Sequence, residues 1–314
     1  MYDLRMDYRV FTEPQQGASF SRLLAVAQRS EQLGFSGFFR SDHYLYIGDG
    51  AARPDVTDAW ITLGAIAVRT STIRLGTLMS SATFRLPGPL AVSIAQVDAM
   101  SNGRLDVGIG AGWYEREHRA YAIPFPNLRD RFDRLEEQLE ILHGFWATPE
   151  GESFGYEGRH YRIEDCPVVF RPLQRPHPPV ILGGYGKRRT PALAARFAAE
   201  FNMPGPGPQQ VAEQFARVDR ACEAIGRDPA SLTKSVWLTV CIGRDEAEFK
   251  RRSAAIGRDA DALKERGIAG LPGEATDALE RYRDLGVSRV YLQFLDLDDM
   301  EHLELAAEVF GVGS

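Results

Sequence analysis

Short apolar runs alternate with amphipathic stretches along this 314-residue chain. In the first half the pattern predicts strands over 4–10, 36–41, 73–80 and 105–110, with helices between them over 19–33, 58–70 and 89–100. Ser19 can cap the first helix and Gly34 can end it, because a serine hydroxyl accepts from unpaired amides and glycine readily turns left-handed. A strand, a turn, a helix and another turn in steady succession are typical of parallel βα units.

The same rhythm continues in the second half around one interruption. A helix with an apolar stripe begins at Asn127 and reaches Trp146. Residues 150–177, rich in glycine, proline and aromatics, break the pattern and predict an inserted hairpin. Strands are then expected over 180–182, 201–203, 236–242 and 290–295, with helices over 190–199, 209–225 and 274–285 and a long polar helix ending near Arg266.

The number and order of these elements predict an α/β protein built as a (β/α)8 TIM barrel. It would form a single domain over residues 1–314, with the inserted hairpin at about 150–177. An open doubly wound sheet shares much of this pattern. The similar length of the repeating units favours the closed barrel.

Composition and charge narrow the range of partners. Hydrophobic residues make up 44% of the chain, and the net charge of -6 arises from acidic and basic residues mixed along its length, so no surface for nucleic acid is expected. The three cysteines, Cys166, Cys222 and Cys241, lie far apart and indicate a reducing compartment. No stretch approaches the roughly 20 apolar residues of a membrane span. The charged N-terminus differs from a signal peptide, so we expect a cytoplasmic protein.

The first candidate for chemistry is the Ser41-Asp42-His43 segment at the end of the second predicted strand. In a TIM barrel, side chains just beyond the C-terminal ends of the strands meet in one pocket. A histidine titrates near neutral pH, and an adjacent acid can orient it or bind a ligand separately. The alternative is an Asp-His pair that only caps the following loop. Position in a barrel favours the functional interpretation.

Two glycine-rich turns are further candidates. Gly108-Ile109-Gly110-Ala111-Gly112-Trp113 follows the fourth strand and would let a flat or anionic ligand approach the backbone, although its glycines could equally ease packing. Leu182-Gly183-Gly184-Tyr185-Gly186-Lys187 follows the fifth strand and resembles a phosphate cradle, although a solvated turn is an open alternative. Neither has the spacing of a dinucleotide fingerprint or a P-loop.

The six histidines predict no metal site, because they form neither an HExxH motif nor a cluster with cysteine. His118, beyond the fourth strand, could reach the barrel mouth, although a position in an exposed loop is favoured. His143 and His302 are expected on helices with their side chains facing solvent. A serine nucleophile is not indicated, since no GxSxG motif occurs.

Taken together, these motifs resemble the luciferase-like oxidoreductases, and within them the branch that uses the deazaflavin F420. The resemblance runs from Leu4 to about Phe310. Its pieces are the segments Phe39-Arg40-Ser41-Asp42-His43-Tyr44, Leu75-Gly76-Thr77, Thr83-Phe84-Arg85-Leu86-Pro87, Ser101 to Trp113, Val180-Ile181-Leu182-Gly183-Gly184 and Pro272-Gly273-Glu274.

The resemblance implies a TIM barrel with an insert and a cofactor at its C-terminal mouth. Asp42 and His43 would contact the ring, with Asp42 the anchor and His43 a base or an orienting group. A cis peptide not preceding proline would lie at Leu78-Met79 and support the back of the ring. Gly183 and Gly184 would give amides to the phosphate. The full set of expected cofactor residues is Asp42, His43, Leu78, Met79, Ser80, Gly110, Gly112, Gly183, Gly184 and Met203.

One departure from the family pattern concerns the substrate. Some sugar-phosphate dehydrogenases of the family have an acidic residue after the glycines of the fourth strand, where this chain has Trp113. Sugar phosphates are therefore doubtful substrates, and Trp113 is a natural wall for an apolar or aromatic one. The insert, which carries Phe154, Tyr156, His160 and Tyr161, could form a partial lid, or its aromatics could simply pack it down.

The leading hypothesis is an F420-dependent oxidoreductase that transfers a hydride between deazaflavin and a small organic substrate. The first alternative is an FMN-dependent monooxygenase that takes reduced flavin from a separate reductase. The second is a non-catalytic flavin-binding barrel, against which Asp42 and His43 argue. The resemblance also implies a homodimer.

Overall fold

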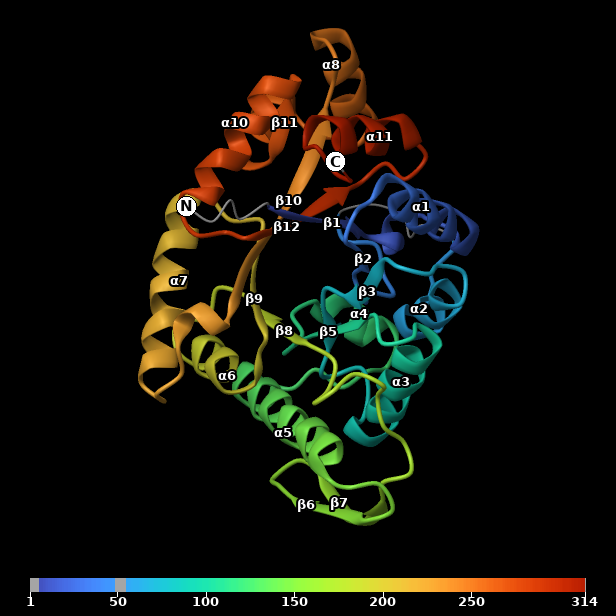
Figure 1. Cartoon of the computed structure of the whole chain (residues 1–314), viewed down its shortest axis with the longest axis vertical. Coiled ribbons are helices and arrows are strands. Elements are labelled where there is room, and N and C mark those ends of the chain that lie inside the picture. The colour runs from blue at the N-terminus through green and yellow to red at the C-terminus, as the bar shows by residue number, and fades with distance from the viewer. Residues whose placement is uncertain (1–5, 49–54, 314) are drawn as a thin grey trace.

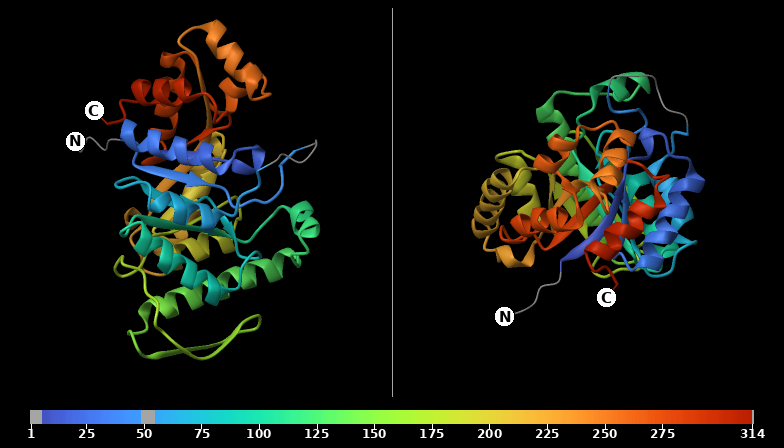
Figure 2. Two further views of the ribbon diagram at one scale, coloured as in Figure 1. Left: turned by 90° about the vertical axis from the view of Figure 1, so that its right-hand side faces the viewer. Right: turned by 90° about the horizontal axis from the view of Figure 1, so that it is seen from above.

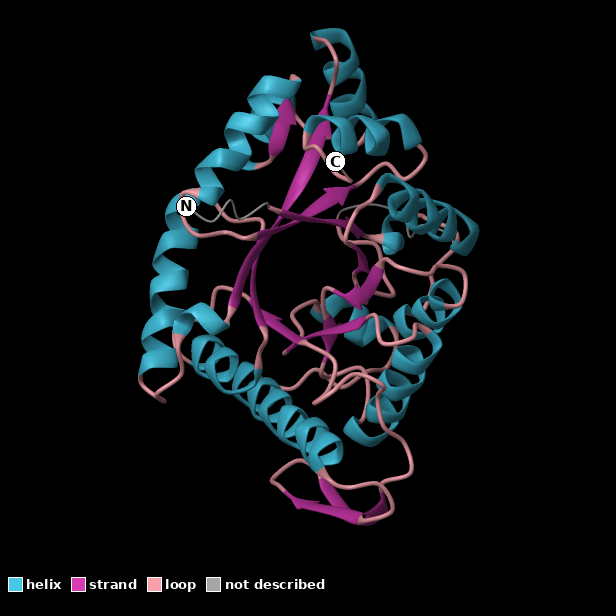
Figure 3. Ribbon diagram, in the orientation of Figure 1, coloured by secondary structure: helices cyan, strands magenta, loops and turns pink. Residues whose placement is uncertain are grey.

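Parallel strands form a closed ring in the computed structural model, which describes residues 6–48 and 55–313. Figures 1 and 3 show this ring at the centre, with helices around it. The predicted TIM barrel is therefore confirmed, and residues 4 and 5 of its first predicted strand lie outside the described residues. In order around the ring the strands are β1 (Asp7–Thr12), β2 (Gly37–Arg40), β3 (Arg74–Thr77), β5 (Leu105–Gly110), β8 (Val180–Gly183), β9 (Glu200–Pro204), β10 (Thr233–Ile242) and β12 (Arg289–Phe294).

The helices begin and end largely where capping residues predict. Ser19 accepts from the Arg22 amide at 3.3 Å, and Gly34 ends the first helix at φ 89°. Asn127 caps the long fifth helix through the Asp130 amide at 3.0 Å. The helices are α1 (Phe20–Leu33), α2 (Ala59–Ala67), α3 (Pro87–Met100), α4 (Glu115–Ala120), α5 (Leu128–Ala147), α6 (Arg189–Phe197), α7 (Pro208–Glu223), α8 (Glu246–Ala255), α9 (Ala260–Arg266), α10 (Pro272–Arg283) and α11 (Met300–Val309).

The third predicted strand is divided in two by a cis peptide between Leu78 and Met79. Its first part is β3, and its second part, β4 (Ser80–Ser81), pairs with β5. The cis bond lies where the family resemblance implies it. Gly76 pairs with Asp106 and Ser80 pairs with Ile109, so three residues of this segment face two residues of β5 and the segment bulges.

The prediction of one long polar helix ending near Arg266 is wrong. Two helices, α8 and α9, occupy this stretch, because Gly257 adopts φ 65° and Asp259 then caps α9 through the Ala262 amide at 2.9 Å. A three-residue strand, β11 (Ile268–Gly270), follows and pairs with β10. It is too short for an alternation of apolar and polar residues to reveal it.

The insert forms the expected hairpin from β6 (Ser153–Glu157) and β7 (Arg162–Pro167), which pair antiparallel. Figures 1 and 2 show it against the outer side of α5, away from the barrel. Phe154 packs so close to Gly144 that a Cβ there would lie 2.3 Å from its ring. The insert contributes no residue to the cavity described below. It packs down, and the idea of a lid is wrong.

Charged residues fill the N-terminal half of the barrel interior. Arg9 of β1, 3% exposed, donates to Asp106 of β5 at 2.6 Å, and Arg289 of β12 pairs with Glu200 of β9. These residues lie early in their strands, so the N-terminal half is closed. The space left for a ligand is at the opposite, C-terminal end.

His302 on α11 contradicts the prediction of a solvent-facing side chain. It is buried, and its Nε2 accepts from the Ile242 amide at 3.0 Å. His143 on α5 is partly buried and packs against Trp146 and His177. Across the described ranges, none of the helices has the length and apolar character needed to cross a membrane.

Candidate active site

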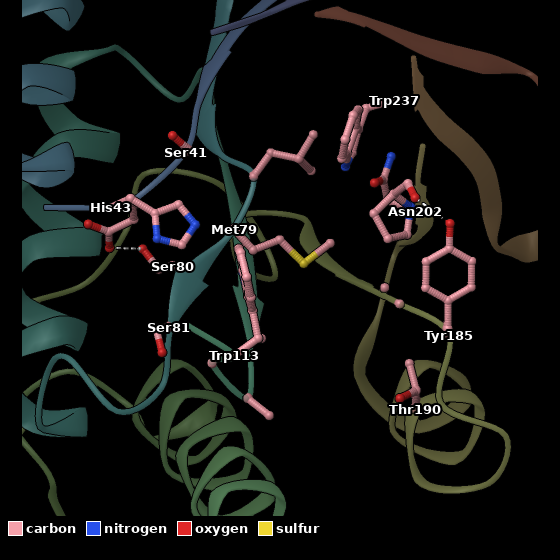
Figure 4. A pocket seen from close by; sticks show the side chains of 18 of the residues that line it. Ser41, His43, Met79, Ser80, Ser81, Trp113, Tyr185, Thr190, Asn202 and Trp237 are labelled. Carbon is pink, nitrogen blue, oxygen red and sulfur yellow. Dashed lines mark hydrogen bonds between the residues drawn. The ribbon is translucent and has the colours of Figure 1, made fainter. Parts of the chain in front are cut away.

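A cavity of about 570 Å³ opens at the C-terminal ends of the barrel strands. Figure 4 shows side chains pointing into it from both sides, with His43 and Trp113 facing Asn202 and Trp237 across Met79. It brings together most of the residues expected from sequence. These are Asp42, His43, Leu78, Met79, Ser80, Gly110, Gly112, Trp113, Gly183 and Gly184.

His43 projects its ring into this cavity from the end of β2 (Figure 4). Its Nδ1 lies 2.7 Å from Oε1 of Glu117, while 14% of its side chain remains exposed. The ring also meets Trp113 edge to face, with centroids 5.7 Å apart. One nitrogen of His43 is therefore engaged by the wall, and the other is available to a ligand.

Asp42 is held inside the wall rather than presented to solvent. Its carboxylate accepts from Ser80 Oγ at 2.7 Å and pairs with the Arg85 guanidinium. Arg85 also bonds Asp58 and the Tyr44 hydroxyl. Burial opposes the charge of Arg85, but Asp42 and its neighbours raise the pKa of this guanidinium above its ordinary value. Asp42 thus lines the cavity and anchors the bulge at β4.

The Leu78-Met79 bulge lies against glycines of β5 and β8. A Cβ on Gly108 would lie 2.0 Å from the Thr77 carbonyl oxygen, and one on Gly183 would lie 2.0 Å from the Asn202 carbonyl and 2.9 Å from Met79 Cε. A Cβ on Gly110 would meet only Met79 Sδ, at 3.9 Å. Gly108 and Gly183 are needed for close packing, whereas Gly110 leaves space at the cavity surface.

Two expected cofactor contacts, those of Met203 and Gly184, meet a different local geometry. Met203 is fully buried in the main core and does not line the cavity, because successive residues of a strand point to opposite faces and its neighbour Asn202 points inward. The Gly184 amide already donates to the Asn202 carbonyl at 3.2 Å, so it is not free for a phosphate.

The turn after β8 offers other amides instead. Gln214 donates to the carbonyls of Gly184 and Gly186, at 3.1 and 2.9 Å. Because the C=O and N–H of a trans peptide point in opposite directions, the amides of Tyr185 and Lys187 point away from Gln214. Within the described ranges neither amide has a hydrogen-bond partner. They precede α6 and are suited to an anionic ligand.

Glu13 and Glu117 are the functional candidates that sequence reasoning missed. Glu13 follows β1, lines the cavity, and accepts from Gln293 Nε2 at 3.0 Å. Burial raises the pKa of Glu13, and its interaction with His43 opposes that rise. Glu117 comes from α4, 74 residues along the chain from His43. The acidic first turn of α4 in Glu115-Arg116-Glu117 was the available signal.

His118 is buried on α4 and lines the cavity, so it reaches the barrel mouth, and the favoured position in an exposed loop is wrong. Its Nδ1 faces the Tyr114 carbonyl at 2.8 Å and its Nε2 faces Thr83 Oγ1 at 2.6 Å. Thr83 in turn bonds Ser81 in the cavity wall at 2.6 Å. His118 itself lines the cavity and supports Ser81 through Thr83.

One group among the described residues has ligand atoms close enough for a metal ion, namely Asp130, Asp133 and His160, within 4.8 Å. Arg159 pairs with both carboxylates, at 3.4 and 3.1 Å, and Arg189 pairs with Asp133. These guanidinium groups already balance the negative charge that a cation would need. The expectation of no metal site stays a prediction.

Comparisons with known proteins agree on one family. The model of the family described as luciferase-like monooxygenase matches residues 6–302. An F420-dependent glucose-6-phosphate dehydrogenase from Microbacterium testaceum is 34% identical over 197 residues, which are 62% of this chain but only 55% of that relative. One of the same name from Intrasporangium calvum is 27% identical over 83% of this chain and 85% of its own. A solved F420-dependent secondary alcohol dehydrogenase, in complex with an F420-acetone adduct, superposes with a TM-score of 0.83 over 99% of both chains at 17% identity.

Proposed function

The chain belongs to the luciferase-like monooxygenase family, and from this premise we propose that it is an F420-dependent oxidoreductase that moves a hydride to or from a small organic substrate. The observation that carries the proposal is the position of His43 beside the Leu78-Met79 bulge, in one cavity at the barrel mouth. The names of the relatives from Microbacterium testaceum and Intrasporangium calvum favour the deazaflavin over FMN.

The cavity fits a flat ring with an anionic tail. Its volume of about 570 Å³ lies in the usual range for cofactor sites. Met79 lies between the two walls, and Tyr185, in the turn that carries the two unpartnered amides, lies at one side. We assign the ring to the Met79 side and the phosphate to the turn before α6.

The chain's own residues position the substrate and handle its proton. When bound, F420 supplies the carbon that accepts or gives up the hydride. His43, with one nitrogen open to the cavity, takes the hydroxyl proton of an alcohol or returns it to a carbonyl. Glu13, whose pKa burial raises, stands in the same wall as a second group able to hold a proton. Trp113 and Trp237 exclude water around the reacting carbon.

The proposed substrate class is a small alcohol or carbonyl compound with an apolar body. Trp113, 61% exposed, stands beside His43 and offers a ring face rather than a carboxylate. The relatives named as glucose-6-phosphate dehydrogenases make sugar phosphates the class to test against it. A panel of secondary alcohols alongside glucose 6-phosphate separates the two classes.

The closest rival remains an FMN-dependent monooxygenase supplied by a separate reductase. Titrating the purified protein with F420 and with FMN, and following fluorescence, distinguishes the two. We expect saturable F420 binding and much weaker FMN binding. Tight FMN binding without F420 binding would overturn the proposal. Binding of F420 with no turnover of any alcohol, carbonyl or sugar phosphate would favour the non-catalytic flavin-binding barrel instead.

We also propose that the protein is a homodimer that associates through α2. Ile61 of this helix and Val68, which follows its last residue, are 76% and 59% exposed, and Ala65 between them is partly exposed. A surface helix normally turns polar residues outward. An apolar outer stripe is typical of a face covered by a partner.

A further inference from the structure

Glu117 has a bonding pattern that sets it apart from the other groups of the cavity wall. Its side chain is 1% exposed, and its two carboxylate oxygens contact two consecutive residues, His43 and Tyr44. Oε1 lies 2.7 Å from His43 Nδ1, and Oε2 accepts from the Tyr44 amide at 2.9 Å. One buried carboxylate therefore contacts both the His43 ring and the backbone just after β2.

Several contacts fix the short helix that carries Glu117. The Tyr114 hydroxyl donates to the Tyr46 carbonyl at 2.8 Å, and the Tyr121 hydroxyl donates to the Tyr44 carbonyl at 2.9 Å. His118, the next residue, is buried against Thr83. Glu117 is thus positioned by α4 and by the loop after β2, and has little freedom to turn away from His43.

A carboxylate beside Nδ1 determines which nitrogen of a neutral imidazole carries the proton. An ionised carboxylate can only accept, so Nδ1 must be the donor. Nε2 then has a free lone pair, on the part of the ring that projects into the cavity. The reverse tautomer would bring two lone pairs together at 2.7 Å.

We propose that Glu117 is a positioning residue for the reaction, which holds His43 in the tautomer that can accept a proton at Nε2. The inference rests on the proposed function, since it assigns a task within that site. In alcohol oxidation the O–H proton passes to Nε2, the hydride of the same carbon passes to oxidised F420, and a carbonyl double bond forms. The resulting imidazolium keeps its Nδ1 bond to Glu117, which balances its charge. Carbonyl reduction is the reverse.

The tautomer can be read without cofactor or substrate. In wild-type protein with ¹⁵N-labelled histidine, at a pH where the ring is neutral, we expect His43 to show a protonated Nδ1 and a bare Nε2. The signal is assigned by its loss in His43→Asn. In Glu117→Gln the amide can also present its NH₂ to the ring, so the Nε2-protonated form should gain population. A wild-type ring protonated at Nε2 would overturn the proposal.

Kinetics give a second readout with F420 and 2-propanol, or the best alcohol of the panel. Glu117→Gln should lower kcat by about 100-fold, in the range of general-base catalysis, with KM nearly unchanged. The matched control is Glu115→Gln on the same helix, whose carboxylate is exposed and lies 3.9 Å from Arg119. It should behave as wild type. A kcat for Glu117→Gln within twofold of wild type would contradict the proposal.

A double-mutant cycle separates positioning from a general structural effect. If Glu117 acts through His43, then adding Glu117→Gln to His43→Ala should lower kcat no further. Equal losses in both backgrounds would overturn the inference. Failure of the wild type to bind F420 would instead count against the proposed function, while the tautomer measurement would still decide the role of Glu117.

Discussion

Replacing His302 with glutamine should remove a pH-dependent part of the stability of this protein. Burial, reinforced by Arg252, lowers the pKa of His302 from 6.5 to about 3, against the opposing effect of Asp299. The Ile242 amide donates to Nε2 at 3.0 Å, so the folded protein holds the ring neutral. A glutamine oxygen can accept the same bond and does not titrate.

The sign and size follow from proton binding. Below pH 6.5 the unfolded chain protonates His302 and the folded chain does not, so this contribution to stability is complete above that pH and declines as the pH falls toward 3. Each pH unit in this window is worth about 1.36 kcal/mol. The wild type should therefore lose more stability on acidification than His302→Gln does. From about pH 7 to 4.5, the difference between their free energies of unfolding should fall by about 2 to 3 kcal/mol.

The assay is urea unfolding of both proteins at the two pH values, followed by circular dichroism. Other groups that titrate, including His143, are common to both proteins and cancel in the difference. The packing lost with the ring also cancels, because it does not change with pH. If the difference in free energy of unfolding between the two proteins is the same at both pH values, the reasoning is refuted.

Four further substitutions test three other parts of the structure. Gly183→Ala should lower the melting temperature clearly, because its Cβ would lie 2.0 Å from a carbonyl oxygen. Gly110→Ala should leave the melting temperature unchanged, because its nearest contact would be at 3.9 Å. Equal shifts in the two variants would contradict the packing argument. Arg85→Met should lower the free energy of unfolding in urea by about 3 to 5 kcal/mol, because it leaves the carboxylates of Asp42 and Asp58 without their cation. A near-neutral effect would show that the network contributes little. Ile61→Lys should shift the gel-filtration mass from a dimer to the 34.9 kDa monomer, and an unchanged dimer would place the interface elsewhere.

Much of the fold could be predicted because its signals are local. Ser19, Gly34 and Asn127 cap their helices as expected, since each cap depends on residues within one turn. The break between α8 and α9 is also marked locally, by Gly257 and by the cap residue Asp259. This break escaped prediction because the whole stretch is polar. The barrel followed from the repetition of such units.

The parts of the site that sequence missed depend on distant contacts. Glu117 and His43 are in contact although they lie 74 residues apart in the sequence. His302 bonds Ile242 at the end of β10, which lies 60 residues earlier in the sequence. No spacing rule reveals such pairs. The prediction that Met203 lines the cavity has a different weakness. A shift of one residue along a strand moves a side chain from the cavity face to the core face.

Hydride transfer itself can be followed with deuterium, and this is the most direct test of the proposed function. The protein is incubated without oxygen with oxidised F420 and 2-propanol, or the best secondary alcohol of the panel, carrying deuterium on its hydroxyl-bearing carbon. The reduced deazaflavin is then analysed by mass spectrometry. We expect one deuterium on the reduced cofactor, delivered from the alcohol. Reduced cofactor without deuterium, or no reduction of F420 by any alcohol while reduced FMN supports oxygen uptake, would contradict the proposed function.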